Sequence, residues 1–107
     1  MRSALSLLGA LILLGTAAYA EPGAQRQSEL LNMLRHDCGS CHGLTLAGGL
    51  GPPLTSQALA GQTREGLIAT IRHGRPGTPM PPWAGLLSDE DVEWLVDAML
   101  EDVGHHD

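Results

Sequence analysis

Apolar residues recur at helical spacing in three stretches of the chain, and no stretch shows the alternation typical of a strand. The stretches are residues 28–38, 63–73 and 88–102. Their apolar stripes are, in order, Leu30, Met33, Leu34 and Cys38; Leu67, Ile68 and Ile71; and Val92, Leu95, Val96, Met99 and Leu100. The pattern predicts an all-α domain with three main helices.

The segments between these helices are long for a simple bundle. Residues 21–27 are expected to form a loose leader to the first helix. Residues 43–61 contain five glycines and two prolines, and residues 75–85 contain four of the seven prolines, so both are predicted to be irregular. Gly74 is the expected stop of the second helix, and Ser88 with Asp91 resembles a capping box at the start of the third. Long loops in a compact domain usually carry function, and these are expected to wrap around something flat.

The first 20 residues are typical of a secretory signal. Arg2 precedes an apolar run from Leu5 to Leu14, and Ala18-Tyr19-Ala20 matches an A-x-A cleavage site. An uncleaved anchor is the alternative, but the apolar run is shorter than the ~20 residues that cross a bilayer. Cleavage after Ala20 is therefore expected. It leaves a mature domain of residues 21–107 in the periplasm, with no stable membrane association.

Composition indicates that this small domain needs help to fold. The chain has no Phe, two Trp and a single Tyr, which lies in the expected signal. A core this small is near the lower limit of self-sufficiency, and such domains often add a cofactor. The mature part has five arginines against twelve carboxylates, a formal charge of −7, which argues against nucleic acid as a partner. Eight of the twelve acidic residues follow position 88. They are interpreted either as a solvated helix face with an acidic tail or as a docking surface.

The only two cysteines lie in Asp37-Cys38-Gly39-Ser40-Cys41-His42-Gly43. Cys-x-x-Cys-His is the attachment motif of c-type haem: two thiols a helical turn apart reach two vinyl groups, and the adjacent His ligates iron. A thioredoxin-like redox pair would need a βαβ context, which is not seen. Structural zinc would need further ligands, and a disulfide across two residues would be strained. One covalent haem c is therefore predicted, held by Cys38, Cys41 and His42.

A sixth iron ligand is expected from Met80, in Thr78-Pro79-Met80-Pro81-Pro82. Prolines on both sides prevent regular structure and stiffen the segment, so that the sulfur is presented in one place. Its alternative role is to cover the haem face. The other candidates are Met33 and Met99, both expected in the core, His73 as runner-up, and His36, His105 and His106. Trp83 is expected as a wall of the haem pocket, with a propionate donor through its indole N–H as the alternative role. Arg64, Arg72 and Arg75 are expected to be propionate donors or a docking patch.

Together these features resemble a class I cytochrome c, and HDCGSCHGLTLAGGLGPPL with HGRPGTPMPPWAGLLSDED resembles the cytochrome c55X family. The resemblance implies three long-looped helices around one covalent haem. It also implies that the Pro52 carbonyl, in Gly51-Pro52-Pro53-Leu54, accepts a hydrogen bond from His42 Nδ1–H. Trp94 matches the aromatic of the last helix that packs against the first.

The c55X resemblance implies an electron carrier for the haem-d1-containing (cytochrome cd1) nitrite reductase of denitrifying bacteria, or a factor in its maturation. A haem with both axial positions filled leaves no site for substrate, so the chain is expected not to be an enzyme. The remaining alternative is a haem-based enzyme or ligand sensor. A monomer that docks briefly with redox partners is expected.

Overall fold

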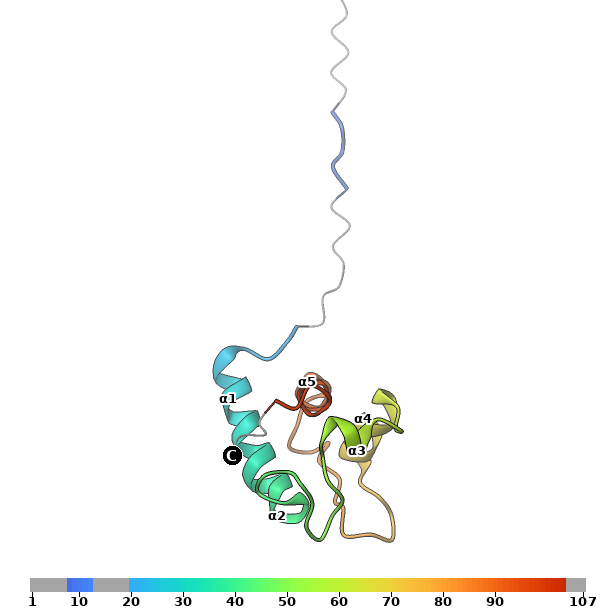
Figure 1. The fold of residues 1–107 in the computed structure, drawn as a ribbon. Helices are drawn as coiled ribbons and strands as arrows, with labels where there is room; N and C mark the ends of the chain where they lie inside the picture. Colours follow the sequence, from blue (N-terminus) through green and yellow to red (C-terminus); the bar gives the residue numbers. More distant parts are fainter. Residues whose placement is uncertain (1–7, 13–19, 104–107) are drawn as a thin grey trace, which may run out of the picture.

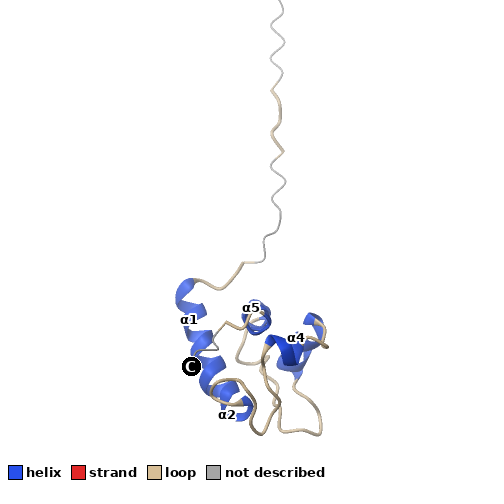
Figure 2. Cartoon of the chain, viewed as in Figure 1, coloured by secondary structure: helices blue, strands red, loops and turns tan. Residues whose placement is uncertain are grey.

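The computed structural model describes residues 8–12 and 20–103, and all regular elements in these ranges are helices (Figure 2). The elements are α1 (Ala24–Met33), the π-helix η1 (Leu34–Cys38), α2 (Gly39–His42), α3 (Ser56–Leu59), α4 (Arg64–His73) and α5 (Asp89–Leu100). The prediction of an all-α fold with three main helices is confirmed. The main helices are the continuous 24–42 segment, α4 and α5.

Helix α5 is the centre of the packing. It contacts α1, α3 and α4, and its buried Val92, Leu95 and Val96 meet Leu30 and Leu34 from the first helical segment. In Figure 1, α5 lies at the upper end of the domain, whereas α2 and the long loops after α2 and α4 extend to the lower end. The helices thus form a core at one end and leave the loops free to build a site at the other.

The first helix begins earlier than the apolar pattern predicts. Residues 24–27 are helical rather than a loose leader. The reason is tertiary: Arg26 of α1 donates two hydrogen bonds to Asp91 of α5, at 2.8 and 3.3 Å. Arg26 also pairs with Glu29 at 2.9 Å. A polar first turn can therefore be helical because charge pairs, and not apolar burial, attach it to the domain.

A π-turn separates α1 from α2. The Gly39 N–H donates to the Leu34 carbonyl, five residues back, where an α-helix would use four. The buried line therefore runs Leu30, Leu34, Gly39, and Cys38 is only half buried. A Cβ on Gly39 would lie 3.4 Å from Leu44 Cα, so the backbone of the next loop packs directly on this glycine. Periodicity alone placed Cys38 on the stripe and missed the inserted residue.

The caps of the other long helices are as expected. The Ser88 hydroxyl accepts from Asp91 N–H and the Asp91 carboxylate accepts from Ser88 N–H, which completes a capping box on α5. Gly74 ends α4 at φ +69°. Helix α3 was missed, because a single turn capped by Thr55 lies inside the glycine-rich loop that was expected to be irregular. Its signal was Thr55 itself, whose hydroxyl accepts from Ala58 N–H at 3.1 Å.

The expected signal falls mostly outside the described residues. Of its residues, only 8–12 and Ala20 are described, and Leu8 and Leu11 are 91% and 84% exposed. In Figure 1 the 8–12 segment lies well away from the helices. Within the described ranges, no helix has both the length and the apolar character that a membrane crossing requires.

Candidate functional site

The two cysteines and His42 lie within one continuous helical stretch, Cys38 at the end of η1 and the other two in α2. Cys38 is half buried and Cys41 is exposed, and both thiols are free. Burial, with a smaller contribution from the charge of Asp37, raises the pKa of the Cys38 thiol to about 11. An attacking cysteine of a redox pair needs the opposite shift, because the thiolate is the nucleophile. The environment of Cys38 therefore argues against a thioredoxin-like role.

The loop after α2 folds back onto the end of that helix. Gly51 N–H donates to the Cys41 carbonyl at 2.7 Å, and Gly48 N–H donates to the His42 carbonyl at 2.8 Å. These bonds satisfy carbonyls that a helix end leaves without partners. The reversal begins at Gly43, whose φ of +92° favours glycine. The loop is therefore irregular in shape and still tightly attached to the turn that carries His42.

That attachment brings the Pro52 carbonyl to the imidazole of His42. His42 Nδ1 lies 2.7 Å from Pro52 O, and because a carbonyl has no proton, Nδ1–H must be the donor. In the Nδ1–H tautomer the ring lone pair lies on Nε2, the atom needed to ligate a metal. Gly51 makes the approach possible, since a Cβ there would lie 2.8 Å from two atoms of the ring.

Met80 lies in a loop that is closed by backbone hydrogen bonds to the end of α4. Arg75 N–H donates to the Met80 carbonyl at 3.2 Å, and Trp83 N–H donates to the Ile71 carbonyl at 2.9 Å. Gly74 allows this closure, because a Cβ at that position would lie 2.7 Å from Met80 O. The half-buried Met80 is thus held by the return of its own loop as well as by prolines.

The competing ligand candidates lie elsewhere. Met99 is buried in the core, with 4% of its surface exposed, and Met33 is partly buried and packs against that core. Both positions agree with the expected core role. His36 and His73 are exposed, and His105 and His106 lie outside the described residues.

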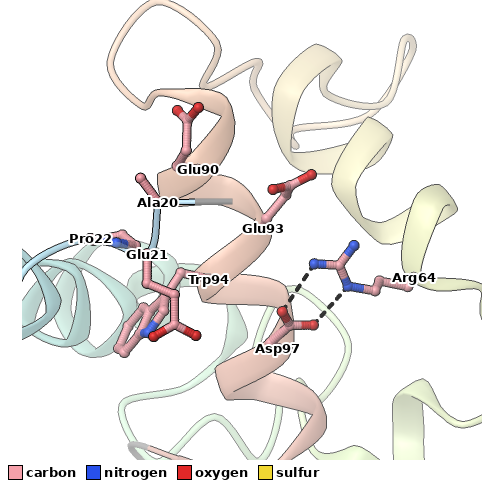
Figure 3. A pocket seen from close by; sticks show the side chains of 8 residues that line it. All are labelled: Ala20, Glu21, Pro22, Arg64, Glu90, Glu93, Trp94 and Asp97. Atoms are coloured by element: carbon pink, nitrogen blue, oxygen red, sulfur yellow. Dashed lines mark hydrogen bonds and ion pairs between the residues drawn. The ribbon is translucent and has the colours of Figure 1, made fainter. Parts of the chain in front are cut away.

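The two tryptophans are both half buried. Trp83 packs against the core from the end of the Met80 loop. Trp94 also contacts the core, and it lines a hollow of about 300 Å³ with Glu21 and Pro22, the residues that lead into α1 (Figure 3). That hollow lies on α5, and its lining includes neither the cysteines nor His42.

The arginines are placed differently from one another. Arg64 makes a two-bond pair with Asp97 of α5, at 2.7 and 3.0 Å, so it serves helix packing (Figure 3). Arg72 pairs with Asp89 at 3.2 Å, but its Nε is buried without a hydrogen-bond partner in the described part of the chain. Arg75 is exposed on the Met80 loop. Of the three, Arg72 is the one with an unused buried donor.

These residues fit a covalently attached haem. The turn offers two free thiols three residues apart and an imidazole with its Nε2 lone pair available. Apolar side chains only partly covered by the core, among them Leu54, Ile71 and Trp83, offer walls for a flat apolar group. The orphaned Nε of Arg72 is the kind of donor that a propionate carboxylate satisfies. In the described ranges, no group of three or more His, Cys, Asp and Glu is placed to hold a metal ion directly.

Known proteins agree with this assignment. The family "Cytochrome C oxidase, cbb3-type, subunit III" matches residues 26–97. Cytochrome c55X of Pseudomonas aeruginosa is 61% identical over 78% of this chain and 71% of its own length. The cytochrome c55X of Stutzerimonas stutzeri is 53% identical over 94% and 92%, respectively. The chain belongs to the cytochrome c55X family.

Two solved structures are similar in fold to this c55X-family cytochrome. The c-type cytochrome NirC superposes with a TM-score of 0.76 at 60% identity, over 78% of this chain and 98% of that one. The dihydro-heme d1 dehydrogenase NirN matches with a TM-score of 0.61 at 35% identity, over 64% of this chain and 15% of NirN. The predicted class I cytochrome c fold is confirmed. This c55X-family member is a denitrification-related c-type cytochrome, and its family binds haem c covalently.

Proposed function

We propose that the protein is a periplasmic electron carrier with one haem, which donates electrons to the cytochrome cd1 nitrite reductase. The observation that carries the proposal is the hydrogen bond from His42 to Pro52 beside two free thiols. It leaves the imidazole in the tautomer that ligates iron, next to the two anchors that a haem c needs. The chain has only two cysteines, so it offers attachment for one haem.

Each residue of the site then has a role. Cys38 and Cys41 would hold a haem through two thioether bonds, each formed by redox-neutral addition of an S–H bond across a vinyl group. His42 Nε2 and the Met80 sulfur would be the two iron ligands that the protein supplies, and Trp83 would form part of the pocket wall. Bound in this way, the haem supplies one-electron Fe(II)/Fe(III) chemistry, and a thioether ligand favours the reduced state. With both iron ligands supplied by the protein, the site would favour electron transfer over catalysis on a bound substrate.

The proposal includes export and removal of residues 1–20. In support, residues 8–12 are exposed and distant from the helices (Figure 1), whereas Glu21 and Pro22, which follow the expected cut, line a hollow against α5. The domain of residues 21–107 would therefore start where the A-x-A motif ends. We further propose that it acts as a monomer, since electron-transfer partners bind through small interfaces and separate quickly.

Stopped-flow mixing of the reduced holoprotein with purified, oxidised cytochrome cd1 tests the proposal. We expect oxidation of the carrier and matching reduction of the enzyme, at a rate that rises with enzyme concentration. Oxidised carrier mixed with the same enzyme provides the control for optical artefacts. A reduced carrier that stays reduced while a small-molecule donor reduces the same enzyme would contradict the proposed partner.

A role in d1-haem maturation is the second candidate, and a specific similarity favours it. The dihydro-heme d1 dehydrogenase of P. aeruginosa is 38% identical to this chain over 84% of this chain's length. The matching segment makes up 16% of the dehydrogenase. A cytochrome of this kind thus occurs joined to a protein named for d1-haem chemistry. Deleting the gene and measuring the d1 content of the reductase separates the two roles. Reductase without d1 indicates maturation, whereas full d1 content with slow turnover indicates electron supply.

A further inference from the structure

The hollow on α5 is the place where the expected cut after residue 20 meets the folded domain. Its volume is about 300 Å³, and the residues on both sides of the Ala20–Glu21 bond line it together with Pro22. In Figure 3 this segment crosses the face of α5 that carries Glu93 and Trp94. The nitrogen that cleavage would release as a free amine therefore lies over α5.

The segment before α1 is restrained from two sides. The side-chain amide of Gln27 donates to the Pro22 carbonyl at 2.8 Å, which ties the segment to α1. The neighbouring Arg26 pairs with Asp91 of α5 at 2.8 Å, which ties the start of α1 to α5. Because Glu21 directly precedes Pro22, these two contacts together keep its backbone nitrogen close to the hollow.

The lining of the hollow has an excess of negative charge. Among the described residues that line it are four carboxylates and a single cation: Glu21, Glu90, Glu93 and Asp97, against Arg64. Arg64 is already paired with Asp97. Glu93 is half buried, and in the described part of the chain it has neither an ion pair nor a hydrogen bond. A carboxylate that loses water without gaining a partner is unfavourable, so Glu93 is the group that most lacks a counter-charge.

We propose that the hollow is a binding site for the protein's own new N-terminus, with the Glu21 α-ammonium beside the Glu93 carboxylate. A signal peptidase adds water to the Ala20–Glu21 amide, so that Ala20 leaves as a carboxylate and the Glu21 nitrogen gains a proton. An α-amino group has a pKa of about 7.7–8.0 and is mostly charged at neutral pH. Cleavage thus places a cation where the folded domain lacks one. The site rests on the proposed export and specifies what cleavage does for the fold.

This site gives the cleaved chain an attachment to α5 that the precursor does not have. An ammonium that gains a carboxylate partner on folding has a raised pKa in the folded state. Its contribution to stability is complete below the unfolded pKa of about 7.7–8.0 and is lost as the pH rises through the folded pKa. The exposed Glu90 should contribute less than Glu93, because water and salt screen a pair at the surface.

The composition of the chain makes the α-amine selectively accessible to chemistry. There is no lysine, so the Glu21 α-amine is the only amine of the cleaved protein. Reductive methylation with 13C-formaldehyde labels it and keeps its positive charge near neutral pH. NMR titration of the label in the reduced holoprotein, and in the same protein unfolded in urea, measures both pKa values. We expect the folded pKa to be higher by about half a pH unit.

Glu93→Gln should remove most of that difference, because it removes the charge and keeps the shape. The matched control is Glu65→Gln, at an exposed position of α4 that does not line the hollow, and it should titrate like wild type. Acetylation of the same amine provides an independent measurement, since it removes the charge that dimethylation retains. At about pH 6 the acetylated holoprotein should unfold at a lower urea concentration than the dimethylated one. The difference should be largely lost in Glu93→Gln and in about 1 M salt.

Intact mass is measured first, because it separates this proposal from the one on which it rests. Protein that still carries residues 1–20 overturns the proposed export and this site with it. Correctly cleaved protein whose amine titrates at the same pH folded and unfolded overturns the site alone. A Glu93→Gln variant that titrates like wild type does the same, and both results leave export and the carrier function intact.

Discussion

His42 and Pro52 are ten residues apart in sequence, and a 2.7 Å hydrogen bond joins the imidazole Nδ1–H of one to the backbone carbonyl of the other. The bond depends on the loop between them. Gly48 and Gly51 donate to the carbonyls of His42 and Cys41, so the loop and the helix end form one unit. The orientation of the proposed iron ligand is therefore set by backbone contacts, and substitutions in the loop should be detected at the iron.

Gly51→Ala should disturb the imidazole directly. The added methyl would lie 2.8 Å from His42 Cε1 and Nδ1, and either the ring or the loop must move. Overpacking of this kind costs about 1–3 kcal/mol, and the longer Nδ1–Pro52 bond should make the ligand less basic. We expect a lower midpoint in guanidinium and a shifted reduction potential in the holoprotein. Gly61→Ala, where a Cβ meets nothing within 4 Å, is the control and should change neither.

Met80→Leu should remove the sulfur ligand while keeping an apolar side chain of similar size. The ferric protein should lose its sulfur-to-iron charge-transfer band and become high-spin or bind external ligands, and its potential should fall. Optical spectra and carbon monoxide binding to the reduced protein provide the measurement. Met99→Leu serves as the control, because a buried volume-conserving change costs less than about 1.5 kcal/mol and leaves iron ligation alone. A Met80→Leu protein with a wild-type spectrum would exclude Met80 as the ligand.

Asp91 should make stability depend on acid. Hydrogen bonds from Arg26, supported by those from Ser88, hold the pKa of its carboxyl below the usual value, against the effect of burial. The stabilisation is therefore complete above the unfolded pKa of about 3.9 and is lost as the pH falls through the lower pKa of the folded state. Chemical denaturation from pH 7 down to pH 2 should show this loss in wild type. In Asp91→Asn, which retains a capping oxygen, stability should be lower near neutral pH and less dependent on pH in this acid range.

Glu90→Gln provides the comparison for Asp91, because Glu90 is an exposed neighbour in the same first turn. Its acid profile should follow that of wild type. Equal profiles for Asp91→Asn and wild type would show that the pair with Arg26 does not contribute to the attachment of α1 to α5.

Export should produce a chain that begins at Glu21. Intact-mass analysis of the protein purified from the periplasm should match residues 21–107 plus one haem. Ala20→Leu removes the small residue before the expected cut and should leave the leader attached, whereas Glu21→Gln, on the other side of the bond, should be processed normally. Recovery of haem-loaded wild-type protein that still carries residues 1–20 would contradict the proposed domain boundary.

Local patterns predicted some elements correctly because their causes are local. The capping box of Ser88 and Asp91 requires only residues three apart, and the stop at Gly74 requires only a backbone freedom that glycine supplies. The same holds for the Cys38–His42 motif, whose chemistry follows from spacing along one helical turn. Pro52 was implied by family resemblance rather than by periodicity, and the hydrogen bond to it is present.

Other features were set by contacts between distant residues. The helical first turn of α1 follows from the pair of Arg26 with Asp91, which are 65 residues apart. No pattern in the neighbouring sequence predicts that pair. The inserted π-turn is seen only in the hydrogen bond from Gly39 to Leu34 and in the packing of Leu44 on that glycine. The pairing of Arg64 with Asp97 likewise depends on contact between two helices, because it joins α4 to α5.

By itself, the sequence determined that the protein is helical, what chemistry its cysteine turn supports and where its helices are capped, because spacing and side-chain type decide these within a few residues. Only the tertiary structure decided how His42 is oriented, how the Met80 loop closes and which leucines of the loop after α2 are buried. Those outcomes depend on the carbonyls and glycines that distant segments bring together. They follow from packing and backbone hydrogen bonding, which one-dimensional patterns do not encode.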